Sequence, residues 1–215
     1  MMRVLAALAA LLFAAAAHAD SWVTPTVREV FSASRDHFVR VTPGVSWGDT
    51  VGFKGAATGR YAEATWYARA ADGSYKPAAT VTLPNPVAPV EFFVADDGRV
   101  VTLDNWHNRG YGVAVAVYAA DGKAIASYKL ADLFTEKEIE AFSHSVSSIH
   151  WHDGPAYINQ DQKTFYLMVK PGADLIVGLE SGRYAYCETR EGKYVCRDRN
   201  EGRVWRPYGE VVLTK

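Results

Sequence analysis

The chain has 215 residues, of which 49% are hydrophobic and 22% are charged. This balance excludes a globally disordered protein and supplies enough apolar material for a sizeable core. The formal net charge of −1 excludes the strongly basic surface that is typical of a nucleic-acid-binding protein.

The first nineteen residues have the pattern of a secretory signal. Arg3 gives a positive start, an apolar run extends from Val4 to Ala17, and Ala17-His18-Ala19 fits the small-x-small cleavage rule. The run of fourteen apolar residues is too short to span a bilayer comfortably. The sequence therefore predicts a signal peptide at 1–19 and a periplasmic or secreted chain at 20–215, a single β-rich domain with no membrane span.

Short runs rich in valine, threonine and aromatic residues follow the signal, and many are separated by Asp-Gly, Pro-Gly or Ser-Gly pairs. Such runs between turn pairs are typical of antiparallel strands joined by hairpins. One short helix is predicted at 135–142, because Thr135 and Glu138 form a capping-box pattern. The predicted strands are 37–42, 61–69, 78–83, 90–95, 99–104, 113–119, 124–130, 164–169 and 174–180.

The chain also repeats itself weakly. Ala-Ala-Asp-Gly occurs at 70–73 and again at 119–122, each time with a strand before it and a strand after it. A glycine-rich insertion at 43–60 accounts for the unequal spacing of the strands upstream, and a fainter third copy covers 165–186. The pattern predicts blade-like units at about 30–83, 90–130 and 147–186.

The segments DDGRVVT (96–102) and VYAADGK (117–123) resemble successive strands in the blades of bacterial β-propellers. The block from Thr82 to Gly112 is similar to an uncharacterised group of exported bacterial proteins with propeller-like repeats. The resemblance covers 30–186 and implies a mainly β fold of two to three blade-like antiparallel units, as a partial propeller or an open sheet stack, with one short connecting helix. It implies no reaction. Closed propellers have roughly four to eight blades, so a homodimer is one way to complete the sheet arrangement.

Both cysteines lie in YCETREGKYVC (186–196). A two-residue turn at Glu191-Gly192 places Cys187 opposite Cys196 in a non-hydrogen-bonded pair, where Cα atoms approach to ~4.5 Å. Export into an oxidising compartment favours a disulfide, which would pin a terminal hairpin at 184–206. Two free thiols are the alternative.

DNWHNRGYG (104–112) connects two predicted strands. Asp and Asn side chains bond their own backbone in turns and glycines add backbone freedom, which favours a structured loop with Trp106 packed beneath it and its indole N–H bonded. Long loops on rigid β scaffolds also carry binding residues. Trp47 and Trp106 are the tryptophans we expect to be exposed. The candidate ligand-binding residues are Asp104, Asn105, Trp106, His107 and Asn108.

A second candidate is HSVSSIHWHDG (144–154). His150 and His152 are two residues apart, so on a strand both would point to one face, a spacing that some metal sites use. Folding could bring His107 close to them. The competing interpretation is a strand end whose imidazoles are half exposed or bonded to backbone.

The sequence contains no Gly-x-Ser-x-Gly nucleophile elbow and no glycine-rich phosphate loop. It predicts no cofactor. The first functional hypothesis is an exported, non-enzymatic binding or structural module of the cell envelope, whose partner is an unknown envelope protein or a small ligand. The alternative is a metal-assisted hydrolase that uses His107, His150 and His152 with Asp104 or Asp153.

Overall fold

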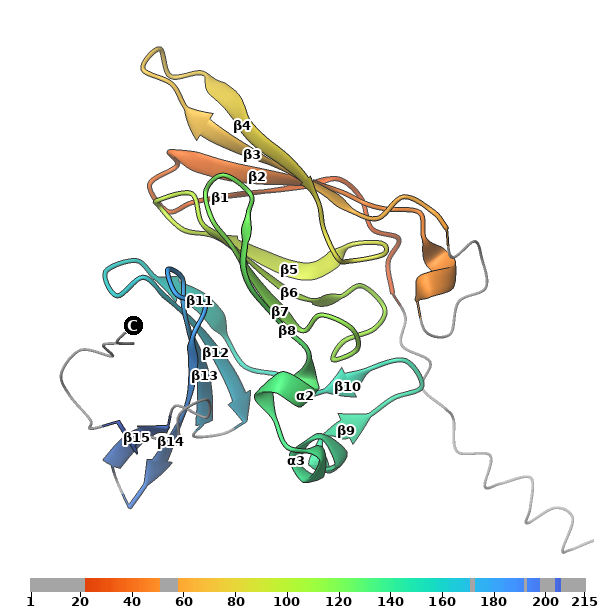
Figure 1. Ribbon diagram of the computed structural model, residues 1–215, viewed down its shortest axis with the longest axis vertical. Coiled ribbons are helices and arrows are strands. Elements are labelled where there is room, and N and C mark those ends of the chain that lie inside the picture. The colour runs from red at the N-terminus through yellow and green to blue at the C-terminus, as the bar shows by residue number, and fades with distance from the viewer. Residues whose placement is uncertain (1–21, 51–57, 171–172, 192, 198–203, 206–215) are drawn as a thin grey trace, which may run out of the picture.

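The computed structural model describes residues 22–50, 58–170, 173–191, 193–197 and 204–205. The predicted signal peptide lies outside these residues. The described residues form three larger antiparallel sheets and one two-stranded ribbon, linked by short helices and turns (Figure 1). The prediction of a mainly β fold with open antiparallel sheets is therefore confirmed.

The first and second sheets are four-stranded meanders in which each strand pairs with the next along the chain. The Ala-Ala-Asp-Gly turns close a hairpin in each, since Gly73 and Gly122 both have a φ of 81°, a left-handed conformation that favours glycine. The first sheet contains β1 (Arg28–Phe31), β2 (His37–Thr42), β3 (Glu63–Arg69) and β4 (Tyr75–Thr82). The second contains β5 (Pro89–Val94), β6 (Val100–Asn105), β7 (Val115–Tyr118) and β8 (Ala124–Tyr128).

The third sheet has six strands, again in chain order, and the small ribbon precedes it. Four observed strands were not predicted from the sequence: β1 in the first sheet, β9 and β10 in the ribbon, and β11 in the third sheet. The third sheet contains β11 (Ala156–Asn159), β12 (Thr164–Lys170), β13 (Ala173–Gly178), β14 (Tyr184–Arg190), β15 (Lys193–Arg197) and β16 (Val204–Trp205). The ribbon pairs β9 (Ser143–His144) with β10 (Ile149–His150).

Two short helices, rather than one, lead from the second sheet towards the third. The predicted helix is α3 (Glu136–Ala141), and its capping box forms as the sequence indicates: the Thr135 hydroxyl accepts from the backbone N–H of Glu138, while the Glu138 carboxylate accepts from that of Thr135. The unpredicted α2 (Leu130–Leu133) lies just before it. A 3-10 turn, η1 (Trp47–Asp49), lies in the glycine-rich insertion.

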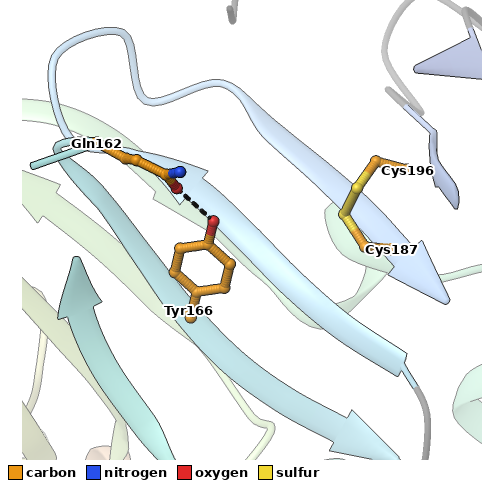
Figure 2. Close-up of a disulfide and its surroundings, with 4 residues drawn as sticks. All are labelled: Gln162, Tyr166, Cys187 and Cys196. Atoms are coloured by element: carbon orange, nitrogen blue, oxygen red, sulfur yellow. Dashed lines mark hydrogen bonds between the residues drawn. A yellow bond between two sulfur atoms is a disulfide. The ribbon is translucent and has the colours of Figure 1, made fainter. Parts of the chain in front are cut away.

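The terminal hairpin has the predicted register. Cys187 lies opposite Cys196 across β14 and β15, and a disulfide joins them (Figure 2). Cys187 is fully buried in a cluster with Ile176 and Ala185, against which Tyr166 packs. The prediction of a disulfide-pinned hairpin is confirmed.

The second sheet is the middle layer of the stack, because its two faces enter two different cores. Val101, Leu103, Val115 and Val117 pack with Phe165 and other residues of the third sheet. Alternate residues of the same strands, Val100, Ala116 and Tyr118, pack with Val39 and Trp66 of the first sheet. Since both faces are covered, every residue of β6 and β7 is buried.

β5, the first strand of the second sheet, contacts both neighbouring sheets: it lies beside β1 and β2 on one side and beside β11 on the other (Figure 1). A hydrogen bond of 2.7 Å from the Arg28 guanidinium to the carbonyl of Val90 joins the first two sheets. Three sheets are fewer than the roughly four to eight blades of a closed propeller. Completion of the stack by a homodimer stays a prediction.

Candidate functional site

Asp104, at the end of β6, is the centre of the loop at 104–112. Its φ is 56° and its side chain is fully buried. The Oδ1 atom accepts hydrogen bonds from the backbone N–H of Gly110 at 2.8 Å and from the indole N–H of Trp151 at 2.9 Å. The Oδ2 atom lies 2.8 Å from Nε2 of His152. Both carboxylate oxygens are therefore engaged.

A buried carboxylate is tolerated only where such partners replace its hydration. Arg109 adds positive charge, with Nε 3.9 Å from Oδ2 of Asp104. These partners come from the loop itself and from Trp151 and His152, which lie between β10 and β11. Asp104 thus ties the second sheet to the connection that leads into the third.

Two asparagines hold the rest of the loop in place. The Asn105 amide donates to the carbonyl of Tyr111 at 2.6 Å, and its oxygen accepts from the Asn85 amide at 2.7 Å. The Asn108 amide donates to the carbonyl of Ser147 at 3.0 Å. The predicted structured loop is confirmed, although its partners include residues far away in the sequence.

Gly110 explains why the loop fits so closely against its neighbours. Its φ is 74°, and a Cβ atom there would lie 2.8 Å from Cβ of Ile149 and 2.9 Å from a methyl group of Leu130. A larger residue at this position would require Ile149, Leu130 or the backbone that donates to Asp104 to move.

Trp106 is buried, with 8% of its surface exposed, so the prediction that it is exposed was wrong. The other expectation, that Trp106 packs beneath the loop with its indole N–H bonded, is confirmed, since this N–H donates to the carbonyl of Val23 at 2.9 Å. The ring meets Trp22 and the half-buried Trp47 edge to face, with centroids 6.0 and 5.0 Å away. His107 joins the same group, 5.5 Å from the Trp106 ring.

A cavity of about 370 Å³ lies beside this aromatic group, between residues 22–28 and the start of β5. The volume falls within the range of small-molecule sites. Its wall is mainly apolar, with a few polar groups from the N-terminal segment. The residues that line it include Trp22, Thr24, Thr26, Arg28, Val90, Phe92 and Trp106.

A second cavity, of about 240 Å³, borders the loop through Asn105, Asn108 and Tyr111, with Asp49 and Tyr61 on its far wall. The amides of Asn105 and Asn108 already donate to protein carbonyls, so they are less free to bind a ligand. This cavity is therefore a poorer candidate for a ligand site than the cavity beside Trp106.

The structure separates the two histidines of the His-x-His pattern. His150 ends β10 and is exposed, whereas His152 is buried against Asp104. The prediction that they share a face was wrong because the strand does not continue: the N–H of Trp151 bonds the carbonyl of Ile149 at 3.0 Å, a tight turn that ends the alternation.

The other proposed metal ligands are also apart. His107 packs with tryptophans, and Asp153 is exposed. Within the described ranges, no group of three or more His, Cys, Asp or Glu side chains could hold a metal ion. The structure therefore does not bring His107, His150 and His152 together with a carboxylate.

No family model and no curated protein matches the chain. Among solved structures, it is similar to the crystal structure of Sqt1 from Saccharomyces cerevisiae, with a TM-score of 0.36 and 10% identity over 86% of this chain and 49% of that chain. The chain thus spans about half the length of that protein. A likeness this weak carries no functional argument, so function must be argued from the site.

Proposed function

We propose that the protein is an exported, non-enzymatic binding module of the cell envelope, periplasmic or secreted, and that its ligand occupies the cavity beside Trp106. The observation that carries this proposal is the apolar cavity of about 370 Å³, whose wall includes Trp22, Phe92 and Trp106. The Asp104 network holds the loop that bears Trp106. Binding sites of small molecules are typically preformed, concave and lined by aromatic rings on a rigid scaffold.

One observation supports the export part of the proposal. The Cys187–Cys196 disulfide is a bond that persists in oxidising compartments. The described part of the chain contains no helix of the length and apolarity needed to cross a membrane. The signal peptide predicted at 1–19 supplies the route.

The geometry favours binding over metal-assisted hydrolysis. A hydrolase of that kind needs a metal with an open position, or a base that reaches the substrate. Asp104 is fully buried, and its two oxygens are occupied by Gly110, Trp151 and His152. His150 is exposed and lies apart from that group.

Calorimetric titration of the purified mature protein with octanol, a neutral apolar probe, tests the proposal. We expect one saturable site because the cavity wall is mainly apolar. Val90→Phe, which adds a ring from the cavity wall, should reduce the affinity for octanol at least tenfold.

Val146→Phe is the matched control, since Val146 is 76% exposed and is not part of the cavity wall. It should bind octanol as the unaltered protein does. Circular dichroism shows whether each variant is folded. Equal octanol binding in the folded Val90→Phe variant would overturn the proposal, and so would failure of octanol and of its charged eight-carbon analogues to bind.

A further inference from the structure

Arg28, the first residue of β1, brings a positive charge to the wall of the apolar cavity. Its Nη1 atom donates to the carbonyl of Val90 at 2.7 Å, and its guanidinium carbon lies 5.0 Å from the centroid of the Phe92 ring. Val90 and Phe92 also line the cavity. These two contacts hold the guanidinium at the wall.

This charge has no acidic partner within the described part of the chain. Arg40 and Arg99 have one, Glu29 and Asp97, whereas Arg35 and Arg60, like Arg28, pair with no acidic side chain in that part of the chain. A guanidinium has five N–H donors and no acceptor, and Arg28 uses one nitrogen on Val90. Arg28 is exposed, so its remaining donors are hydrated, and an anion at the edge of the cavity can replace that water.

Other polar groups line the same cavity. Thr24 and Thr26 are exposed and bring hydroxyl groups to its wall. The indole nitrogen of Trp22 has no hydrogen-bond partner within the described residues, but neighbouring atoms cover it, so it offers a ligand no donor.

We propose that the cavity binds a small amphipathic carboxylate, with its apolar tail among the aromatic rings and its carboxylate at Arg28. This inference rests on the proposed function, since it names the ligand class of the same cavity. A carboxylate is acceptor-only and matches the planar fork of a guanidinium with two parallel hydrogen bonds. A cationic head group would be repelled by Arg28, and a neutral one would gain no charge–charge attraction from it.

The test compares three probes with the same eight-carbon chain: octanoate, octanol and octylamine. Calorimetry is run on the unaltered protein and on the Arg28→Gln variant. We expect octanoate to bind at least tenfold more tightly than octylamine, and Arg28→Gln to weaken octanoate about tenfold while octanol changes less than twofold.

Arg35→Gln is the matched control. The Arg35 guanidinium lies 4.7 Å from the centroid of the Phe31 ring, as Arg28 lies over Phe92, but it is not part of the cavity wall. Octanoate affinity in this variant should equal that of the unaltered protein.

The outcomes separate this inference from the function on which it rests. Saturable octanol binding without a preference for octanoate, or an equal loss of both probes in Arg28→Gln, would overturn the carboxylate assignment and leave the binding cavity standing. Failure of all three probes to bind would overturn both.

Discussion

Asp104→Asn is expected to lower the free energy of unfolding by about 3–5 kcal/mol, the usual cost of breaking a buried charged network. The substitution preserves size, but the amide nitrogen presents a donor where the carboxylate accepts. The amide oxygen can still accept from Gly110 and Trp151, but the amide nitrogen then faces Nε2 of His152, which can pair with it only as an acceptor, and the negative charge beside Arg109 is lost. Urea denaturation followed by tryptophan fluorescence measures the loss.

Asp153→Asn is the matched control, since Asp153 is exposed and lies beside His152 in the sequence. It should change the free energy of unfolding by less than about 0.5 kcal/mol. The same comparison applies to the histidines: His152→Ala should cost far more stability than His150→Ala. A loss below about 1 kcal/mol for Asp104→Asn would refute the structural role of the carboxylate.

Trp106→Ala is expected to cost about 3–5 kcal/mol of stability, the range seen when a large aromatic ring is removed from a packed interior. The variant loses the edge-to-face contacts with Trp22 and Trp47 and the hydrogen bond to Val23. It also removes one wall of the cavity, so octanol affinity should fall with it. Thermal and urea denaturation measure the first effect, and calorimetry measures the second.

Trp106→Phe separates the ring from its N–H group. It keeps most of the apolar contact and loses the bond to the carbonyl of Val23, so it should cost only about 1–2 kcal/mol. If Trp106→Ala and Trp106→Phe were equally mild, the tryptophan would not be the anchor of the loop described above.

Features with local causes were predictable from the sequence. The register of the terminal hairpin follows from the turn at Glu191 and the count outward to Cys187 and Cys196. The start of α3 follows from Thr135 and Glu138, three residues apart. The longer strands follow from their composition and from the glycine turns between them. The short strands β1, β9 and β11 show no pattern of their own, whereas β7, although it has only four residues, lies within a longer apolar run and was predicted.

The candidate site was predictable only in part, because its partners are distant in the sequence. Asp104 is bonded by Trp151 and His152, 47 and 48 residues away, and Trp106 by Val23, 83 residues away. No local pattern marks Arg28 or Trp22 as wall residues of a cavity. The histidine prediction failed because it assumed a strand through Trp151, where the backbone makes a tight turn instead.

A ligand in the cavity beside Trp106 would change the surroundings of its tryptophans, and the indole N–H signals in a nitrogen–proton correlation spectrum report such a change. The chain has six tryptophans, and replacing each with phenylalanine assigns the signals. Trp22 and Trp106 line the cavity, whereas Trp151 is fully buried in the core between the second and third sheets. On titration with octanoate, the signals of Trp22 and Trp106 should move and saturate together, while that of Trp151 moves much less. Unchanged signals from Trp22 and Trp106 at saturating octanoate would show that octanoate does not bind in this cavity.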